Sequence, residues 1–236
     1  MRHTIKFSAL AFTLVALAAI AGRSAMAQVA PSASEVAAYK GLHAAAQKGD
    51  IAKLEKLAAA KADLNARDGN GRTPLHVATF AKQREAIRAL VKAGADINLL
   101  DKDRYDGVTI ASVADDEETL RALLASGASA KLITSRYDGT ALIAAAHLGH
   151  DGVVKQLIAA GAPLDHVNNL HWTAAIEAVV LGNGGLRHQE TLRALIKAGA
   201  NLQLTDKQGN TPLQLATARG YAEMVKMLSM PAPASK

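Results

Sequence analysis

Two short patterns recur along this chain with a period of about 33 residues, which is typical of a solenoid in which each unit covers the apolar face of its neighbour. One is "TPLHVA", which begins at Thr73, and the other is "AGAD", around Gly94. The interval from Thr140 to Gly161 is the commonest from the first pattern to the second, and the interval from Gly161 to Thr173 is the commonest from the second pattern to the next copy of the first. The first pattern begins at Lys40, Thr73, Thr109, Thr140, Thr173 and Thr211, and the second lies around Lys61, Gly94, Gly127, Gly161 and Gly199.

Each period predicts a pair of helices. Thr73 has the character of a helix cap, and Pro74 suits the first helical position. After a glycine turn, an amphipathic segment with Val153, Val154 and Leu157 predicts a second helix that ends at Gly161. Half of the residues are apolar but only 3% are aromatic, so the core consists mainly of Ala, Leu, Ile and Val. This composition favours closely packed helices over a β-sandwich.

The pattern T-P-L-H-x-A, followed by G-H or G-D, an apolar helix and G-A-D, resembles the ankyrin repeat. The resemblance extends from Lys40 to about Met230. It implies an all-α solenoid of about six stacked helix-turn-helix repeats with projecting β-hairpin fingers. It also implies a non-catalytic protein–protein interaction module that binds through its concave face. The expected repeats lie near 40–68, 69–103, 104–135, 136–167, 168–206 and 207–230.

The two ends are expected to differ from the repeats. Arg2 and Lys6, the apolar stretch "SALAFTLVALAAI" and the small residues "AMA" predict a signal peptide over 1–27, cleaved after Ala27. An uncleaved N-terminal anchor is the alternative. Residues 28–39 are expected to hold an N-terminal capping helix, because Ser32 and Glu35 have capping-box spacing. Residues 231–236 are expected to be a flexible tail.

The net charge and the cysteine content exclude several classes of function. Removal of residues 1–27 lowers the net charge from +6 to +3, which argues against nucleic acid as the main partner. The chain contains no cysteine, so disulfides, thiol catalysis and a lipid-modified N-terminus are excluded. We therefore expect an exported, periplasmic, monomeric protein of a Gram-negative bacterium, without membrane insertion after cleavage. The resemblance to secreted bacterial ankyrin proteins adds an alternative, a protective or inhibitory binder of a periplasmic enzyme or toxin.

No enzyme motif is evident. G-x-S-x-G, G-x-x-x-x-G-K-[ST] and H-E-x-x-H are all missing, so neither catalysis nor a cofactor is predicted. The resemblance implies that His43 and His76 bond between repeats and that His150 caps a turn. His147 and His150 are three residues apart and could share a metal, which leaves open a metal-binding protein or enzyme as the alternative of another class.

The loops before the first helices point to a partner site. Aligned on the first pattern, they read "DGNG" (68–71), "RYDG" (104–107), "RYDG" (136–139), "NNLH" (168–171) and "DKQG" (206–209). The middle three depart from the Asp-first, Gly-fourth pattern of the family, which either a partner or sequence drift explains.

Three intervals also depart from the regular ones. The interval from Gly94 to Thr109 is longer, which predicts a longer finger there. The interval from Thr109 to Gly127 is shorter, which predicts a short repeat. Five extra residues are expected in the fifth repeat, near "NGGLRH".

Aromatic and apolar residues gather in the expected binding face. The exposed ends of the first helices are expected at Gln47/Lys48, Phe80/Ala81, Asp115/Asp116, His147/Leu148, Val180/Leu181 and Ala218/Arg219. Trp172, the only tryptophan, falls beside them. Trp, Tyr and Arg are enriched in interface hot spots. Trp172 could instead cover its own repeat. The predicted partner-binding residues are Arg104, Tyr105, Arg136, Tyr137, Leu170, Trp172, Phe80, His147, Leu148, Val180 and Leu181.

Overall fold

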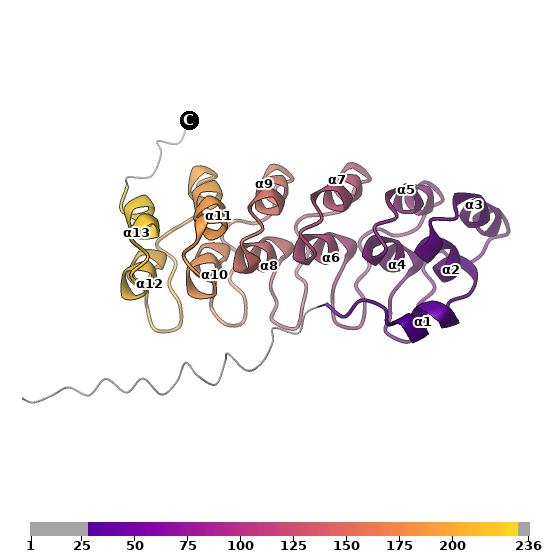
Figure 1. The fold of residues 1–236 in the computed structure, drawn as a ribbon, viewed down its shortest axis with the longest axis horizontal. Helices are drawn as coiled ribbons and strands as arrows, with labels where there is room; N and C mark the ends of the chain where they lie inside the picture. Colours follow the sequence, from indigo (N-terminus) through magenta and orange to yellow (C-terminus); the bar gives the residue numbers. More distant parts are fainter. Residues whose placement is uncertain (1–27, 231–236) are drawn as a thin grey trace, which may run out of the picture.

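Two parallel rows of helices make up the molecule, a computed structural model that describes residues 28–230 (Figure 1). The described residues hold thirteen helices and no strand, which confirms the predicted all-α solenoid. The predicted signal peptide and tail lie outside the described residues. The first row contains α2 (Gly41–Lys48), α4 (Pro74–Phe80), α6 (Gly107–Val113), α8 (Ala141–Leu148), α10 (Ala174–Val180) and α12 (Pro212–Ala218). The second row contains α3 (Ile51–Ala59), α5 (Arg84–Lys92), α7 (Glu117–Ala125), α9 (Asp151–Ala159), α11 (Leu186–Lys197) and α13 (Ala222–Leu228).

Threonine caps start most helices of the first row. The hydroxyls of Thr73, Thr140, Thr173 and Thr211 each accept the backbone N–H three residues later. Two of these threonines are followed by proline at the first helical position, where the missing N–H has no helical acceptor. The helix starts predicted at these positions are therefore confirmed.

The core is a single cluster that runs from Leu42 to Leu228. In every repeat the fifth residue after the helix cap is a buried alanine, which allows neighbouring first-row helices to approach closely. Leucines from both rows fill the space between the rows, among them the fully buried Leu75, Leu142 and Leu192. The recurring buried alanines are Ala45, Ala78, Ala111, Ala145, Ala178 and Ala216.

The third repeat begins at Asp106, and the alignment on Thr109 was wrong. Asp106 is the cap of α6, one regular period after Thr73, and its carboxylate accepts the Thr109 backbone N–H at 2.9 Å. Thr109 takes the place that His76 has in the preceding repeat. Its hydroxyl donates to Asp106 at 2.5 Å and approaches the Thr134 hydroxyl at 3.2 Å. Aspartate caps a helix as well as threonine does, so either residue fits a helix start.

The corrected register removes two predicted anomalies. The intervals from Gly94 to Asp106 and from Asp106 to Gly127 equal those of the regular repeats. The predictions of a longer finger before α6 and of a short third repeat were therefore wrong. The extra residue lies instead between Gly127 and Thr140. It is accommodated in a loop closed by the isolated bridge between Thr134 and Gly139.

The insertion predicted in the fifth repeat forms a loop and an additional helical turn. Residues 182–185 make the loop, and α11 has 12 residues where α3, α5, α7 and α9 have nine. At the start of α11, Arg187 reaches Asp115 at 2.8 Å and Asp151 at 3.4 Å. The insertion therefore links the fifth repeat to the third and fourth repeats.

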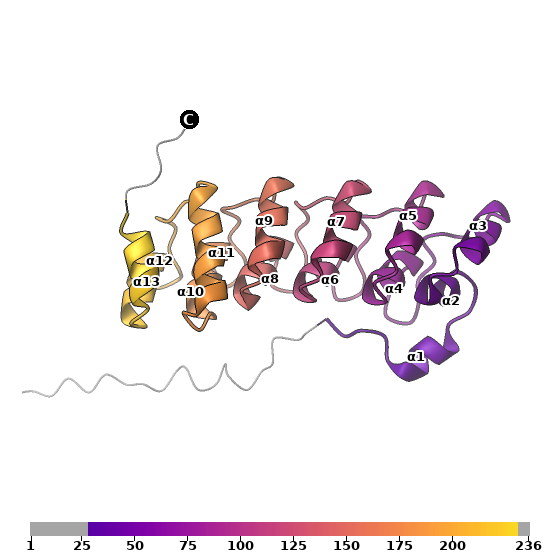
Figure 2. The ribbon, with the colours of Figure 1, turned by 45° about the horizontal axis from the view of Figure 1, so that its top comes forward.

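The N-terminal helix α1 (Ala33–Ala38) lies against the first finger. Its predicted capping box between Ser32 and Glu35 is present, but none of its residues is buried. Glu35 pairs with Arg72, and the Tyr39 hydroxyl donates to Asp68 at 2.8 Å. Figure 2 shows α1 beside the loops and apart from α3. The predicted helix is present, but α2 and α3, rather than α1, cover the end of the stack.

Candidate partner-binding surface

The C-terminal ends of the first-row helices form a line of side chains along the molecule. We call this line the first-helix strip and define it as the seventh and eighth residues after each helix cap. Because α6 starts after Asp106, Val113 and Ala114 occupy the positions predicted for Asp115 and Asp116. Asp116 is instead the buried cap of α7, where it accepts the Thr119 N–H at 3.0 Å. The strip therefore comprises Gln47/Lys48, Phe80/Ala81, Val113/Ala114, His147/Leu148, Val180/Leu181 and Ala218/Arg219.

The chain's own N-terminal segment, residues 28–32, covers one part of this strip. Gln28 and Ala30 border the same cavity as Phe80 and Val113. The Arg72 guanidinium donates to the Val29 carbonyl at 3.4 Å and also pairs with Glu35, so the finger before α4 holds the segment. The predicted contact residue Phe80 lies in this covered part.

The other part of the strip exposes apolar side chains to solvent. Leu148 at the end of α8 is 39% exposed, and Leu181 just after α10 is 37% exposed. Val180 and His147 beside them are half-buried, and so is Trp172, which directly precedes the cap of α10. Helices α8 and α10 pack directly against each other. The structure thus brings the predicted strip residues of the fourth and fifth repeats together, whereas Trp172 lies at the opposite end of α10.

The fingers share a first position that folds the loop back on itself. The side-chain oxygens of Asp68, Asp101, Asn168 and Asp206 each accept backbone N–H groups two and four residues later. Ser135 accepts one such bond, from the Tyr137 N–H at 3.2 Å. The prediction that Arg104 and Arg136 stand at this first position was wrong, because Asp101 and Ser135 occupy it.

The fourth position of the fingers departs from glycine in the three middle loops. Gly71 and Gly209 have positive φ angles in the outer fingers, and Arg104, Asp138 and His171 adopt the same left-handed conformation in the middle ones. Their φ angles are 66°, 51° and 63°. The left-handed conformation costs a residue with a Cβ about 1–2 kcal/mol. The middle fingers therefore carry side chains where glycine would be less strained.

The two copies of "RYDG" are not equivalent. In the first copy Asp106 caps α6 and Gly107 is the first helical residue. In the second copy Asp138 takes the left-handed position and Gly139 precedes the cap Thr140. Tyr105 is consequently half-buried beside its helix, whereas Tyr137 is 41% exposed in its loop.

Polar contacts connect the middle fingers to one another. Arg104 pairs with Asp138 at 2.8 Å and Arg136 pairs with Asp103 at 3.1 Å, all four side chains being about half exposed. Exposed ion pairs contribute about 0.2–1 kcal/mol each. The Asn169 N–H donates to the Tyr137 carbonyl at 2.9 Å, which joins the loop that carries Leu170 to the loop that carries Tyr137. The predicted residues Arg104, Arg136, Tyr137 and Leu170 thus lie on three consecutive fingers.

Most of the histidines serve contacts between repeats. His43 bonds to the Arg72 carbonyl at 2.9 Å and His76 to the Tyr105 carbonyl at 3.0 Å, as the family resemblance implied. His150 Nδ1 donates to the Ser112 carbonyl at 2.8 Å, across a repeat boundary. No group of three or more His, Asp or Glu side chains placed to hold a metal occurs within residues 28–230.

One polar residue of this surface, Glu177, was not predicted from the sequence. Glu177 on α10 is only 4% exposed, and its Oε1 accepts from the Asn168 side-chain amide at 3.0 Å. Its Oε2 accepts no hydrogen bond from a described residue and lies 3.5 Å from His147 Nδ1. Burial raises the pKa of Glu177 to about 7. A glutamate inside an otherwise apolar helix, "AAIEAVV", was the available signal.

Paired helices, looped fingers and an exposed apolar strip together define a repeat scaffold of the protein-interaction class. A sequence profile described as ankyrin repeats in three copies matches residues 13–105 and 108–206, and one described as ankyrin repeats in many copies matches 185–228. The chain belongs to the ankyrin-repeat family. Within residues 28–230, no helix combines the length and apolar character that a membrane crossing requires.

Bacterial relatives share most of the chain. The putative ankyrin repeat protein YahD of Escherichia coli K12 is 37% identical over 185 residues, which are 78% of this chain and 92% of YahD. An ankyrin repeat domain from Acinetobacter baumannii AYE is 46% identical, with a TM-score of 0.74, over 79% of this chain and 95% of that domain. A chain in the complex of a Bdellovibrio bacteriovorus predatory endopeptidase with an immunity protein is 27% identical, with a TM-score of 0.62, over 81% and 97%.

Proposed function

We propose that this protein is exported to the periplasm and binds a partner protein there, without chemistry of its own. The observation that carries the proposal is the exposed apolar part of the first-helix strip. Leu148 and Leu181 lie there at the ends of the adjacent helices α8 and α10. Clustered apolar surface of this kind usually marks an interaction site. Export is supported by the signal-peptide pattern of residues 1–27.

A protective or inhibitory role is the more specific candidate. The structural neighbour from Bdellovibrio comes from a complex of an endopeptidase with an immunity protein. By analogy, the partner would be a periplasmic enzyme or toxin whose activity falls on binding. Inhibition would then arise because the bound solenoid covers the partner's own active site.

Site-specific photocrosslinking in living cells tests both location and surface. The full-length protein carries a photoreactive amino acid at Leu181, or at the exposed second-row position Arg193 as the control. We expect crosslinks to one envelope protein from position 181 and none from position 193, together with N-terminal sequencing that starts at Gln28. Crosslinks only from position 193, or from neither position, would refute the proposed surface. A protein retained in the cytoplasm would refute the proposed export.

A further inference from the structure

One charged residue interrupts an apolar row on the first helices. The fourth residue after each helix cap lies one helical turn before the first-helix strip. Five of the six residues in this row are alanine, valine, isoleucine or leucine, and the sixth is glutamate. The row comprises Ala44, Val77, Ile110, Ala144, Glu177 and Leu215.

The Glu177 carboxylate is buried without a cation. Within residues 28–230, the basic group that comes within 4.0 Å of it is His147, at 3.5 Å. Burial lowers the pKa of His147, and the neighbouring His188 and His150 lower it further, so this ring is neutral at pH 7. A buried carboxylate that lacks a cationic partner is costly, because desolvation is not repaid by an attraction. The raised pKa of Glu177 has the same cause, because burial disfavours the ionised carboxylate.

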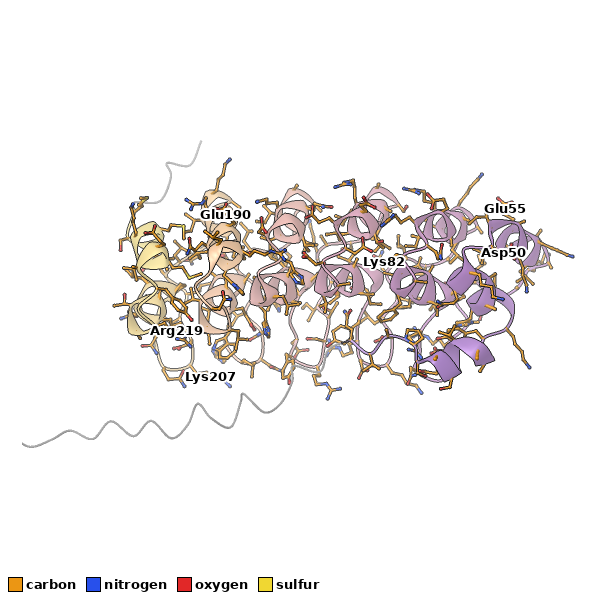
Figure 3. The ribbon with its side chains drawn as sticks, viewed as in Figure 1. Asp50, Glu55, Lys82, Glu190, Lys207 and Arg219 are labelled. Carbon is orange, nitrogen blue, oxygen red and sulfur yellow. The ribbon has the colours of Figure 1, made fainter. Side chains whose placement is uncertain are left out.

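His147 is the partly exposed neighbour of the buried Glu177 carboxylate. Its Nδ1 lies 3.5 Å from Oε2 and its side chain is 30% exposed, so an incoming side chain has to displace this ring to reach Oε2. Leu148 and Leu181 are exposed near it and can cover the aliphatic stem of a long side chain. Arg219, on the next repeat (Figure 3), is engaged elsewhere, since it donates to the Val180 carbonyl at 3.2 Å.

The molecule itself shows what kind of ligand this face accepts. Residues 28–32 lie as a non-helical chain across the part formed by α4 and α6, where Arg72 holds the Val29 carbonyl. In that covered part the row residues Val77 and Ile110 are apolar, and Ile110 borders the cavity that Gln28 and Ala30 also line. In the open part the corresponding row position is an acid. A segment that lies there with similar geometry therefore needs a base at one position.

We propose that Glu177 is the anchor for a lysine or arginine carried by an extended segment of the partner protein. The cationic group pairs with Oε2 in place of the His147 ring, and Leu148 and Leu181 flank its stem. This inference rests on the proposed protein-binding function and specifies the chemistry of the partner. Truncation of one member of a buried interfacial charge pair typically weakens binding well beyond tenfold.

Selection from a phage library of random dodecapeptides tests the inference on the protein as it exists. We expect selected peptides to be enriched in Lys or Arg at one position. Their affinity should fall at least tenfold in Glu177→Gln and when the peptide base is replaced by Gln. Glu190→Gln is the matched control and should bind like the wild type, because it removes a partly exposed carboxylate on α11, in the second row (Figure 3). Leu181→Asp should abolish binding.

The outcomes separate the inference from the proposed function. Peptides that lose binding to Leu181→Asp but lack a common base, or tolerate Glu177→Gln, would overturn the Glu177 anchor and leave the binding surface in place. Peptides that bind Leu181→Asp normally, or a library without enrichment, would overturn both. Urea unfolding of each variant establishes that any loss of binding is not a loss of fold.

Discussion

Replacement of Glu177 by glutamine should make the protein more stable at alkaline pH. Glutamine has the shape of the protonated acid, and its side-chain oxygen can still accept from the Asn168 amide, as Oε1 does at 3.0 Å. The substitution removes the ionised form, which is disfavoured in the folded protein because the residue is 4% exposed. The benefit should therefore appear where the wild-type side chain would be ionised.

The magnitude follows from the pKa of Glu177, which is 4.5 for the unperturbed group and about 7 in the folded protein. An acid whose folded pKa is raised contributes full stability below its unfolded pKa and loses it as the pH rises to the folded pKa. The loss occurs between about pH 4.5 and 7 and approaches about 3 kcal/mol above pH 7. Glu177→Gln should therefore gain about 2–3 kcal/mol on the wild type between pH 5 and pH 8.

Urea unfolding followed by circular dichroism at pH 5, 6, 7 and 8 measures this difference. His147, whose pKa burial lowers, makes the folded protein less stable as the pH falls through its range. The comparison of pH 7 with pH 8 lies above the lowered pKa of His147 and is therefore largely free of this contribution. Glu190→Gln serves as the control and should show no pH-dependent gain. An equal stability difference at pH 5 and pH 8, or a less stable Glu177→Gln at pH 8, would show that burial of this carboxyl is not costly.

Four further predictions test the packing, the register and the surface. Leu142→Ala, at a fully buried position, should lower the free energy of unfolding in urea by about 2–5 kcal/mol, and a loss below about 1 kcal/mol would contradict the core assignment. Asp106→Ala should lower the same free energy by about 1–2 kcal/mol because α6 loses its cap, whereas Asp106→Thr should restore most of it; equal losses would argue against Asp106 as the cap. Arg104→Gly should raise the free energy of unfolding by less than about 1 kcal/mol, since relief of the left-handed strain outweighs the loss of the exposed ion pair with Asp138. A clear decrease in the free energy of unfolding would show that the ion pair outweighs the strain. Trp172→Ala or Arg136→Ala should weaken binding to the crosslinked partner by about 2–4 kcal/mol, as is typical of interface hot spots, while the variant stays folded. Calorimetry measures the affinity, and unchanged affinity in both variants would remove these residues from the interface.

Local sequence signals were sufficient for most of the fold. The caps Thr73, Thr140, Thr173 and Thr211 recur in register, and each depends on a contact with a residue three positions later. The third repeat was misplaced because Asp106 and Thr109 can both cap a helix and lie within one helical turn of each other. Packing decides between them, since a start at Asp106 places Ala111 at the buried alanine position that every other repeat also has.

The binding surface was only partly predictable. The exposure of Leu148, Leu181, Tyr137 and Leu170 agrees with the sequence, because their positions follow from the repeat period. Arg104 and Arg136 were expected at equivalent positions, but Arg104 lies two residues before the cap Asp106 and Arg136 lies four residues before the cap Thr140. Only the fold shows that each arginine pairs with an acid on a neighbouring finger.

The repeat period alone determined that this chain is a stack of helix pairs, because caps, turns and apolar spacing act over short distances. The tertiary structure decided which residues meet across that stack. It placed residues 28–32 over the strip formed by α4 and α6, and it left Glu177 buried beside a neutral His147. Such contacts join residues from different repeats, and burial sets their energies, so no local pattern encodes them.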